Sequence, residues 1–185
     1  VGPGLSAQEE TGRLVRALMK ENRLPAVLDA DGLNAFAGRP DELAGIRKGT
    51  VLTPHYGELS RITGEPIGDV SANRIETART WAQRFRAVLV LKGAPTVVGS
   101  PDGTVFLNPT GNSGMATAGA GDVLTGMIAG FLAQGSEPLD AALCGVYIHG
   151  LAGDLAAGAD GERSLIAGDL ITRIPDALRE TEKGG

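Results

Sequence analysis

The sequence NPTGNSGMATAGAGDVLTGMIAGFLAQG, residues 108–135, joins a glycine-rich loop to an apolar segment. Apolar residues recur with helical spacing in its second half, which predicts a helix over 123–132. A helix N-terminus presents unpaired backbone N–H groups and the positive end of the helix dipole, and glycines let a ligand approach the backbone closely. The stretch therefore predicts an anion-binding site at the start of a helix.

A carboxylate, Asp122, occupies this junction. Because like charges repel, a carboxylate is a poor ligand for phosphate, and a catalytic base explains the residue better than a binding role does. The simpler alternative is that Asp122 caps the helix while Gly119 and Gly121 shape a turn. The stretch matches neither the GxxxxGK[ST] pattern of a P-loop nor a dinucleotide fingerprint, which places its glycines directly after a strand.

Composition limits the class of protein. A chain of 185 residues that is 42% hydrophobic and 21% charged predicts one globular domain over 1–185 with its own core. A net charge of −5 argues against a nucleic-acid or membrane partner. The chain shows neither a signal peptide nor a charge-free run of membrane-spanning length, so we expect a soluble cytoplasmic protein. The single cysteine, Cys144, is expected to be a buried structural thiol.

The order of predicted elements indicates an α/β layered fold with a mostly parallel sheet flanked by helices. Strands are expected over 26–29, 51–54 and 87–91, with an edge hairpin over 96–99 and 104–108. Helices are expected over 6–22, 58–63, 71–86, 123–132, 139–157 and 166–179. Three details accompany these ranges: Ser6 caps the first helix with Glu9, the helix over 71–86 buries Ile75, Ala78, Ala82 and Phe85, and Gly184–Gly185 is a loose end.

Polar side chains follow the predicted parallel strands. Asp29 and Asp31 follow one strand, His55 the next and Lys92 the longest. Because ligands bind outside the carboxyl ends of parallel strands, we expect these groups to converge with Asp122.

Several segments together resemble the NAD(P)H-hydrate dehydratase family, carbohydrate-kinase-like repair enzymes of the ribokinase-like fold. In chain order they are GPGL (2–5), LDADGLNA (28–35), TPHYGE (53–58), VLKGAPTVV (90–98), residues 112–135, and GVYIHGLAGDLA (145–156). The resemblance covers essentially the whole chain.

The resemblance implies a lyase that removes water from hydrated NADH or NADPH, with ADP split to AMP and phosphate or ATP split to ADP and phosphate. The 6-hydroxyl of the hydrated nicotinamide ring would be phosphorylated, and phosphate would then leave. By its place in the motif, Asp122 is implied to be the base that activates this hydroxyl. In such phosphoryl transfer, positioning and charge stabilisation dominate.

The resemblance also assigns binding residues. The nucleotide site is implied to comprise Lys92, Gly93, Ala94, Pro95, Thr96, Gly119, Ala120 and Gly121. Gly4 and His55 would contact the hydrated dinucleotide together with Asp122. Glu58 would help to hold a hydrated Mg²⁺, an ion that keeps several of its waters.

The chain departs from the family pattern at three points. The usual GPGLG reads GPGLS, and TPHPGE reads TPHYGE, so Tyr56 replaces a proline and is expected to loosen the loop. The strands and helices that normally precede the GPGLG turn are absent from the sequence, so VGPGL reads as the tail of a strand that starts inside a domain. An open sheet edge predicts a homo-oligomer or a partner segment. His149 is expected to be a packed or capping residue.

Two alternative functions remain open. One is a small-molecule kinase of the same superfamily, acting on a hydroxymethylpyrimidine, a thiazole or a sugar, with Asp122 in the same role. The other is an inactive nucleotide-binding fragment. The acceptor segments TPHYGE and LDADGLNA favour the dehydratase over the kinase, and the presence of both Asp122 and Lys92 argues against simple decay.

Overall fold

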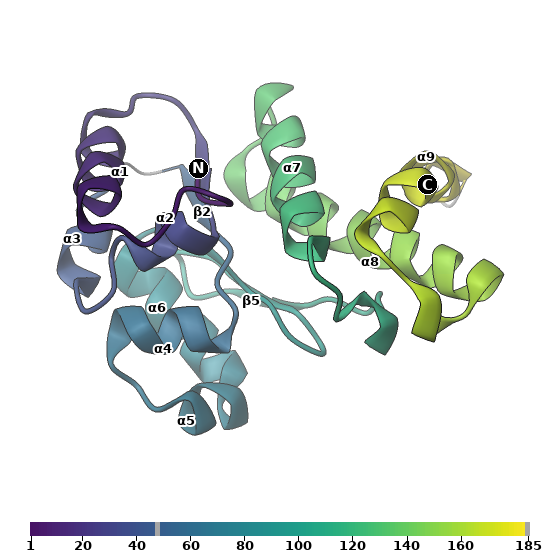
Figure 1. Ribbon diagram of the computed structural model, residues 1–185, viewed down its shortest axis with the longest axis horizontal. Helices are drawn as coiled ribbons and strands as arrows, with labels where there is room; N and C mark the ends of the chain where they lie inside the picture. The colour runs from purple at the N-terminus through teal and green to yellow at the C-terminus, as the bar shows by residue number, and fades with distance from the viewer. Residues whose placement is uncertain (47–48, 184–185) are drawn as a thin grey trace.

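A five-stranded sheet forms the centre of the protein in the computed structural model, which describes residues 1–46 and 49–183 (Figure 1). Its strands are β1 (Ala26–Leu28), β2 (Thr50–Leu52), β3 (Val88–Leu91), β4 (Val97–Gly99) and β5 (Val105–Leu107), adjacent in that order. The pairs β1/β2 and β2/β3 are parallel, whereas β4 and β5 are antiparallel to their neighbours. The predicted parallel sheet with an edge hairpin is thus confirmed. The expected loose end, Gly184–Gly185, lies outside the described residues.

The helices form a layer on each face of this sheet (Figure 1). The first layer holds α1 (Glu9–Glu21), α2 (Ala30–Asn34), α3 (Pro40–Ala44), α4 (Tyr56–Thr63), α5 (Ile67–Ala72) and α6 (Arg74–Phe85). The second holds α7 (Ala120–Ala133), α8 (Pro138–Asp160) and α9 (Ala167–Lys183), with α9 packed on the outer side of α8. Two short 3₁₀ turns lie in the connections: η1 (Ser113–Met115) precedes α7, and η2 (Glu162–Ser164) precedes α9.

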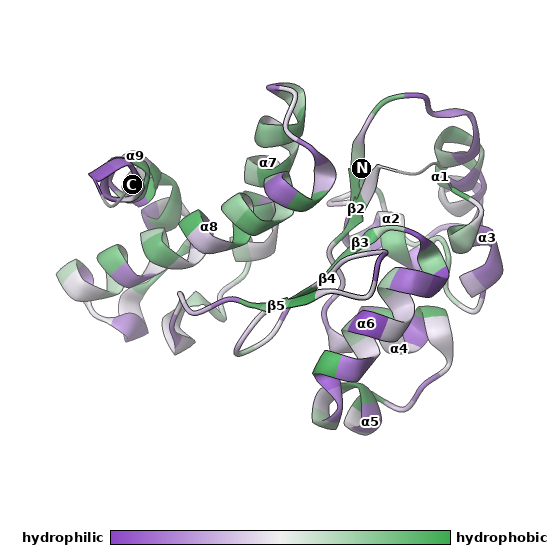
Figure 2. Cartoon of the chain, turned by 180° about the vertical axis from the view of Figure 1, so that it is seen from behind, coloured by the Kyte–Doolittle hydropathy of each residue, from purple (hydrophilic) through white to green (hydrophobic). Residues whose placement is uncertain are grey.

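Alternation along the strands divides the core into two parts. On β3, Leu89 and Leu91 face the first helical layer, whereas Val88 and Val90 face α7 and α8. Successive side chains of a strand point to opposite faces, so a continuous apolar strand fills both cores. The green strands between the helices in Figure 2 show this apolar interior. The sheet is therefore held from both sides, and its carboxyl ends have fixed positions.

Small residues let α8 approach its neighbours closely. A Cβ at Gly145 would lie 2.6 Å from Ile128 of α7, and one at Gly153 would lie 2.3 Å from Met115. By length and composition α8 is also apolar enough to cross a membrane, but 56% of that window is buried inside the protein. We interpret α8 as a core helix, because its glycines let it pack closely against its neighbours.

The first helix starts later than predicted. It begins at Glu9, and Gln8 is its N-cap residue without a side-chain cap bond, so the expected capping by Ser6 is wrong. Ser6 instead adopts a left-handed backbone with φ of 75°, and its N–H donates to Asp31. At the start of the chain, Val1 runs beside β1, because its carbonyl oxygen accepts a hydrogen bond from the backbone N–H of Asp29.

Two expectations about buried side chains are also wrong. The predicted helix over 71–86 is two helices that meet at Asn73. Ala78, Ala82 and Phe85 are buried as expected, but Ile75 is 40% exposed and Trp81 joins the buried stripe. Cys144 is exposed, because α8 turns Ala141, Ala142, Gly145 and Val146 inward and leaves this position on its outer side.

Candidate active site

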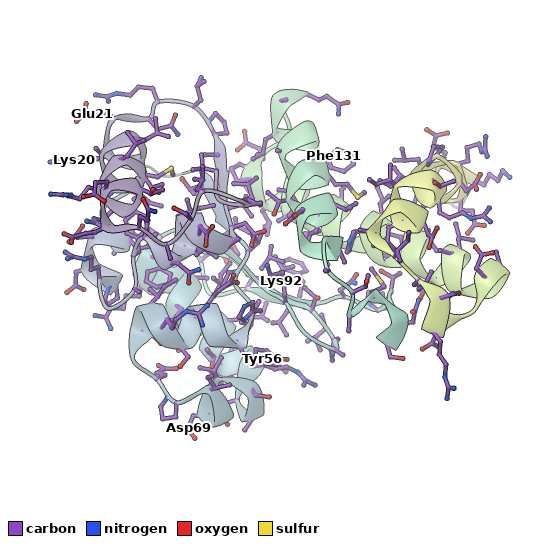
Figure 3. All side chains as sticks on the ribbon, viewed as in Figure 1. Lys20, Glu21, Tyr56, Asp69, Lys92 and Phe131 are labelled. Carbon is purple, nitrogen blue, oxygen red and sulfur yellow. The ribbon has the colours of Figure 1, made fainter. Side chains whose placement is uncertain are left out.

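A buried ion pair joins the ends of β1 and β3. Lys92 directly follows β3, and its Nζ lies 2.7 Å from Asp29 Oδ1 and 3.7 Å from Glu58 Oε2. Asp29 is 1% exposed, and burying a carboxylate is costly unless partners such as these offset the loss of water. Lys92 lies between the α4 side of the molecule and α7 (Figure 3). Asp29 therefore converges with Lys92 as expected, and Glu58, which was not expected in this cluster, joins them.

The other oxygen of Asp29 binds the second helical layer. Thr125 of α7 donates a hydrogen bond of 2.8 Å to Asp29 Oδ2. Thr125 lies one helical turn after Gly121, so this bond sets the first turn of α7 against the end of β1. Asp29 thus holds both the cation of β3 and the helix that carries Asp122.

His55 directly precedes α4 and is its N-cap residue. Its Nδ1 accepts from the N–H groups of Gly57 (3.0 Å) and Glu58 (3.3 Å), while its own N–H donates to Glu58 Oε2 (2.8 Å). This is a complete capping box, which satisfies otherwise unpaired donors at the helix start. The loop is therefore fixed, and the expected loosening by Tyr56 is wrong.

The surroundings of His55 keep its ring neutral. Burial lowers the pKa of His55, with the positive charges of Lys92 and Arg61 acting in the same direction and Glu58 opposing them. Because Nδ1 accepts two hydrogen bonds, the neutral ring carries its hydrogen on Nε2. This nitrogen lies 3.5 Å from Glu58 Oε1 on a half-exposed side chain. His55 can therefore donate to a ligand through Nε2.

Asp122 lies in the first turn of α7 and is exposed. The N-cap position belongs to Gly119, with φ of 87°, and no side chain caps this helix, so the alternative of Asp122 as the cap is wrong. Among the described residues, no hydrogen bond or ion pair holds its carboxylate. Asp122 is thus available to a ligand at the N-terminus of α7.

The nucleotide residues implied by the resemblance come from two places that meet at Lys92. A Cβ at Gly121 would lie 3.5 Å from Lys92 Nζ, so the ammonium faces the first turn of α7. The segment after Lys92 closes on itself, because Thr96 Oγ1 donates to Gly93 O (3.1 Å) before β4 begins. Backbone N–H groups of α7 and the ammonium of Lys92 therefore surround one small volume with donors.

Gly4 lies in a turn beside the end of β1. Leu5 N donates to Gly2 O (3.3 Å), and a Cβ at Gly2 would lie only 1.7 Å from Asp29 O, so this position requires glycine. Gly4 itself, with φ of 76°, has no atom within 4 Å of an added Cβ and faces open space.

A chain of side-chain bonds links this turn to α4. Asp31 Oδ2 accepts from Ser6 N (2.8 Å), and Asn34 Oδ1 accepts from Arg61 Nε (3.0 Å). Asn34 and Asp31 are in turn within 3.5 Å of each other. Ser6, two residues after Gly4, is therefore connected to Arg61 of α4, the helix that His55 caps; we call this edge, from the turn at Gly4 to the start of α4, the rim.

Helix α8 anchors both ends of the glycine-rich loop. Asp154 accepts from Gly111 N and from Asn112 Nδ2, each at 2.9 Å. At the other end His149 Nε2 lies 2.9 Å from Ala120 O. Burial lowers the pKa of His149 to about 4, so the ring is neutral at pH 7 and donates this hydrogen bond. The expectation of a packed histidine is confirmed.

The two buried carboxylates of the site, Asp29 and Glu58, leave little for direct metal ligation. Both oxygens of Asp29 are occupied, and those of Glu58 face His55 and Lys92. Over residues 1–46 and 49–183 no group of three or more His, Cys, Asp or Glu side chains could hold a metal ion. These residues fit a hydrated Mg²⁺ held mainly by the phosphates of a nucleotide.

Sequence reasoning missed Thr125 and the pairing of Asp29 with Lys92. The pairs are 96 and 63 residues apart, and no local pattern connects such positions. A signal for Thr125 did exist: a polar residue one turn after Gly121, on the buried face of an otherwise apolar helix.

The sequence of this chain is similar to those of known proteins of one family. The family model described as NAD(P)H-hydrate dehydratase matches residues 1–176. A bifunctional NAD(P)H-hydrate repair enzyme of Moorella thermoacetica is 50% identical over 183 residues, which is 99% of this chain and 34% of that protein. The ADP-dependent (S)-NAD(P)H-hydrate dehydratase of Bacillus subtilis is 39% identical over 98% of this chain and 64% of its own length.

Solved structures agree with the sequence relatives. The crystal structure of the ADP/ATP-dependent NAD(P)H-hydrate dehydratase of Bacillus subtilis, co-crystallised with ATP and Mg²⁺, matches with a TM-score of 0.86 at 37% identity. The match covers 97% of this chain and 63% of that chain. The chain thus spans about a third of the bifunctional relative and under two thirds of the dehydratases.

Proposed function

The chain belongs to the NAD(P)H-hydrate dehydratase family, and from this premise we propose that it returns hydrated NADH or NADPH to NADH or NADPH. ADP or ATP is the phosphoryl donor, consistent with the names of the Bacillus subtilis relatives. The observation that carries the proposal is the exposed, unheld carboxylate of Asp122 on an α7 N-terminus that faces Lys92.

In the first step Asp122 accepts the proton of the 6-hydroxyl on the hydrated nicotinamide ring. That oxygen attacks the terminal phosphorus of the nucleotide, and the bond to the leaving AMP or ADP breaks. In the second step the ring carbon–oxygen bond breaks and the phosphate leaves with that oxygen, while the neighbouring ring carbon gives up a proton to solvent, so that the ring regains its double bond. The protein supplies a base and fixed positive charge, which are the main needs of phosphoryl transfer.

Donors around Lys92 suit the terminal phosphate. An ammonium has three N–H groups, and Asp29 takes one of them at hydrogen-bond distance, so others remain for a ligand. The N–H groups of the first turn of α7, from Gly119 to Gly121, add the partial positive charge of a helix N-terminus. The segment Ala94–Pro95–Thr96 would line the rest of the nucleotide. Mg²⁺ would be bound with the nucleotide phosphates and would neutralise part of their charge.

The hydrated dinucleotide would lie between the turn at Gly4 and the helix start at His55. The Nε2 hydrogen of His55 and the open backbone at Gly4 support this assignment, because both are exposed at the rim next to Asp29. Both lie at the carboxyl ends of the parallel strands, as Asp122 does across the sheet.

An assay of hydrated NADH with ADP and with ATP, monitored by NADH absorbance, tests the proposal. We expect Asp122→Asn to bind nucleotide as the parent protein does and to lose nearly all turnover. The matched control is Asp140→Asn, because Asp140 is exposed at the third position of α8, as Asp122 is in α7. Near-normal turnover by Asp122→Asn would remove the base from the mechanism.

We also propose that the chain acts in the cytoplasm as a homo-oligomer. The support is a pair of exposed leucines one helical turn apart on α1, Leu14 (68%) and Leu18 (50%). Such side chains are usually covered in an assembly when they cluster. Light scattering at several concentrations checks this, and a monomeric mass at all of them would contradict it.

A further inference from the structure

The side chain of Tyr56 lies over the nucleotide loop. Tyr56 is the first residue of α4, directly after His55, and its half-buried ring packs against the core of the first helical layer. A Cβ at Gly93 would lie 2.1 Å from the Tyr56 hydroxyl oxygen and 2.6 Å from Cζ. The phenol therefore occupies the space that a side chain at position 93 would take. Figure 3 labels both Tyr56 and Lys92 in this part of the molecule.

The hydroxyl of Tyr56 is a donor without an assigned acceptor. Among the described residues, no hydrogen bond uses this oxygen, whereas Nδ1 of the neighbouring His55 and Oε2 of Glu58 both accept hydrogen bonds in the capping box. A tyrosine whose ring is packed normally finds a partner for its O–H group. The packing fixes the ring, so the direction of the hydroxyl is fixed without being used by the protein.

The position of this hydroxyl against Gly93, next to Lys92 in the chain, favours an anion as its acceptor. Lys92 directly precedes Gly93, and the ammonium of Lys92 faces the N-terminus of α7 across Gly121. The carboxylates closest to Lys92, Asp29 and Glu58, already have partners. A phosphate near Lys92 would thus meet positive charge, backbone donors and the free phenol O–H, all of which are complementary to it.

We propose that the Tyr56 hydroxyl donates a hydrogen bond to a phosphate oxygen of the bound ADP or ATP, so that Tyr56 is a further nucleotide-binding residue. The inference rests on the proposed function for the identity of the nucleotide. It assigns Tyr56 to the nucleotide rather than to the hydrated dinucleotide, because the hydroxyl lies on Gly93 and not on the rim at Gly4.

Calorimetric titration of the full chain with ADP and with ATP, in the presence of Mg²⁺, tests the proposal. Tyr56→Phe removes only the hydroxyl and keeps the ring that covers Gly93. Because a hydrogen bond to a charged group stabilises a complex appreciably, we expect its loss to raise the Kd for nucleotide about tenfold. The matched control is Tyr147→Phe, because Tyr147 is 40% exposed on α8 and its hydroxyl has no assigned partner in the described chain.

Two further measurements separate binding from a packing role. The thermal unfolding midpoint without nucleotide should be the same for Tyr56→Phe and the parent, because the ring is retained. The KM for hydrated NADH should also be unchanged at saturating nucleotide. A Kd for ADP and ATP equal to that of the parent would overturn the proposal, and so would a loss confined to hydrated NADH.

The two proposals fail in different ways. If the parent binds ADP but does not convert hydrated NADH, the proposed function fails while the titration of Tyr56→Phe still decides the role of the hydroxyl. If conversion is normal and Tyr56→Phe binds ADP like the parent, this inference alone fails. A parent chain that binds neither ADP nor ATP would overturn this inference directly.

Discussion

The hydroxyl of Thr125 and the carboxylate of Asp29 form a buried hydrogen bond of 2.8 Å between residues that are 96 positions apart. This bond is the point where the helix carrying Asp122 is fixed to the sheet carrying Lys92. The other oxygen of Asp29 binds Lys92 at 2.7 Å, so one buried carboxylate determines the positions of two groups in the site.

Replacement of Thr125 should therefore affect turnover more than binding. Thr125→Val keeps the shape but leaves one oxygen of Asp29 without a donor, which costs about 1–3 kcal/mol in unfolding free energy. We expect kcat for hydrated NADH to fall about tenfold, because a small misplacement of Asp122 weakens a positioned proton transfer. Thr125→Ser retains the hydroxyl and should restore most of kcat. Equal kcat values for the Val and Ser variants would contradict a positioning role.

Gly121→Ala should separate stability from nucleotide binding. Alanine is favoured over glycine in helices by up to about 1 kcal/mol, so we expect a higher unfolding midpoint. The added methyl group would lie 3.5 Å from Lys92 Nζ, in the volume assigned to phosphate, so the Kd for ADP should rise. Gly126→Ala is the control, because its Cβ has no atom within 4 Å and it lies in the same helix. Unchanged ADP affinity in Gly121→Ala would place the phosphate elsewhere.

Lys92 has a structural role as well as a proposed binding role. Lys92→Ala leaves the buried carboxylate of Asp29 without its cation, and we expect a loss of about 3 kcal/mol or more in unfolding free energy. Adding Asp29→Asn removes the unpaired charge and should recover part of this stability. Nucleotide affinity should stay low in both variants. It should fall by more than the affinity for the hydrated dinucleotide does. Denaturant unfolding and calorimetry measure these effects, and recovery of ADP binding by the double variant would argue against contact between Lys92 and phosphate.

The buried His149 should make the protein sensitive to acid. Its pKa is lowered to about 4 in the folded protein by burial, from an ordinary value of 6.5. Between these values the unfolded chain binds more protons, so stability rises with pH, and it falls as pH drops from about 6.5 towards 4. The total effect is at most about 3 kcal/mol. Denaturant unfolding of His149→Gln, compared with the parent across this range, should show a flatter dependence; parallel curves would exclude His149 as the source.

Regular elements were predictable where a local pattern carried the information. The apolar run over 87–91 predicted a strand buried on both faces. The glycine-rich stretch predicted a helix N-terminus at the Asp122 junction, and the structure begins α7 slightly earlier, with Gly119 as its N-cap residue. Errors arose where tertiary contacts chose between equivalent local options. Ser6 is a good cap residue in sequence, but Asp31 attracts its N–H, and the chain turns before α1 begins.

The composition of the site was predictable, but its connections were not. Asp29, His55, Lys92 and Asp122 all stand at strand ends or a helix start, where a parallel sheet brings ligand-binding groups together. That Asp29 holds Lys92 and Thr125 depends on which helix packs beside β1, and sequence spacing does not encode that contact.

The cap of α4 has a consequence for the protein in acid. Most helix caps are hydroxyl or carboxylate oxygens, whereas here the acceptor is Nδ1 of His55, which a proton can occupy. Protonation would release the two N–H groups that it holds and put a positive charge at the positive end of the helix. The sheet, whose contacts are between valine and leucine side chains, has no such sensitive group. We expect the protection of the Gly57 and Glu58 amides against hydrogen exchange, relative to their intrinsic rates at each pH, to fall on mild acidification before protection in β3 does, so that ligand binding has a narrower pH range than folding.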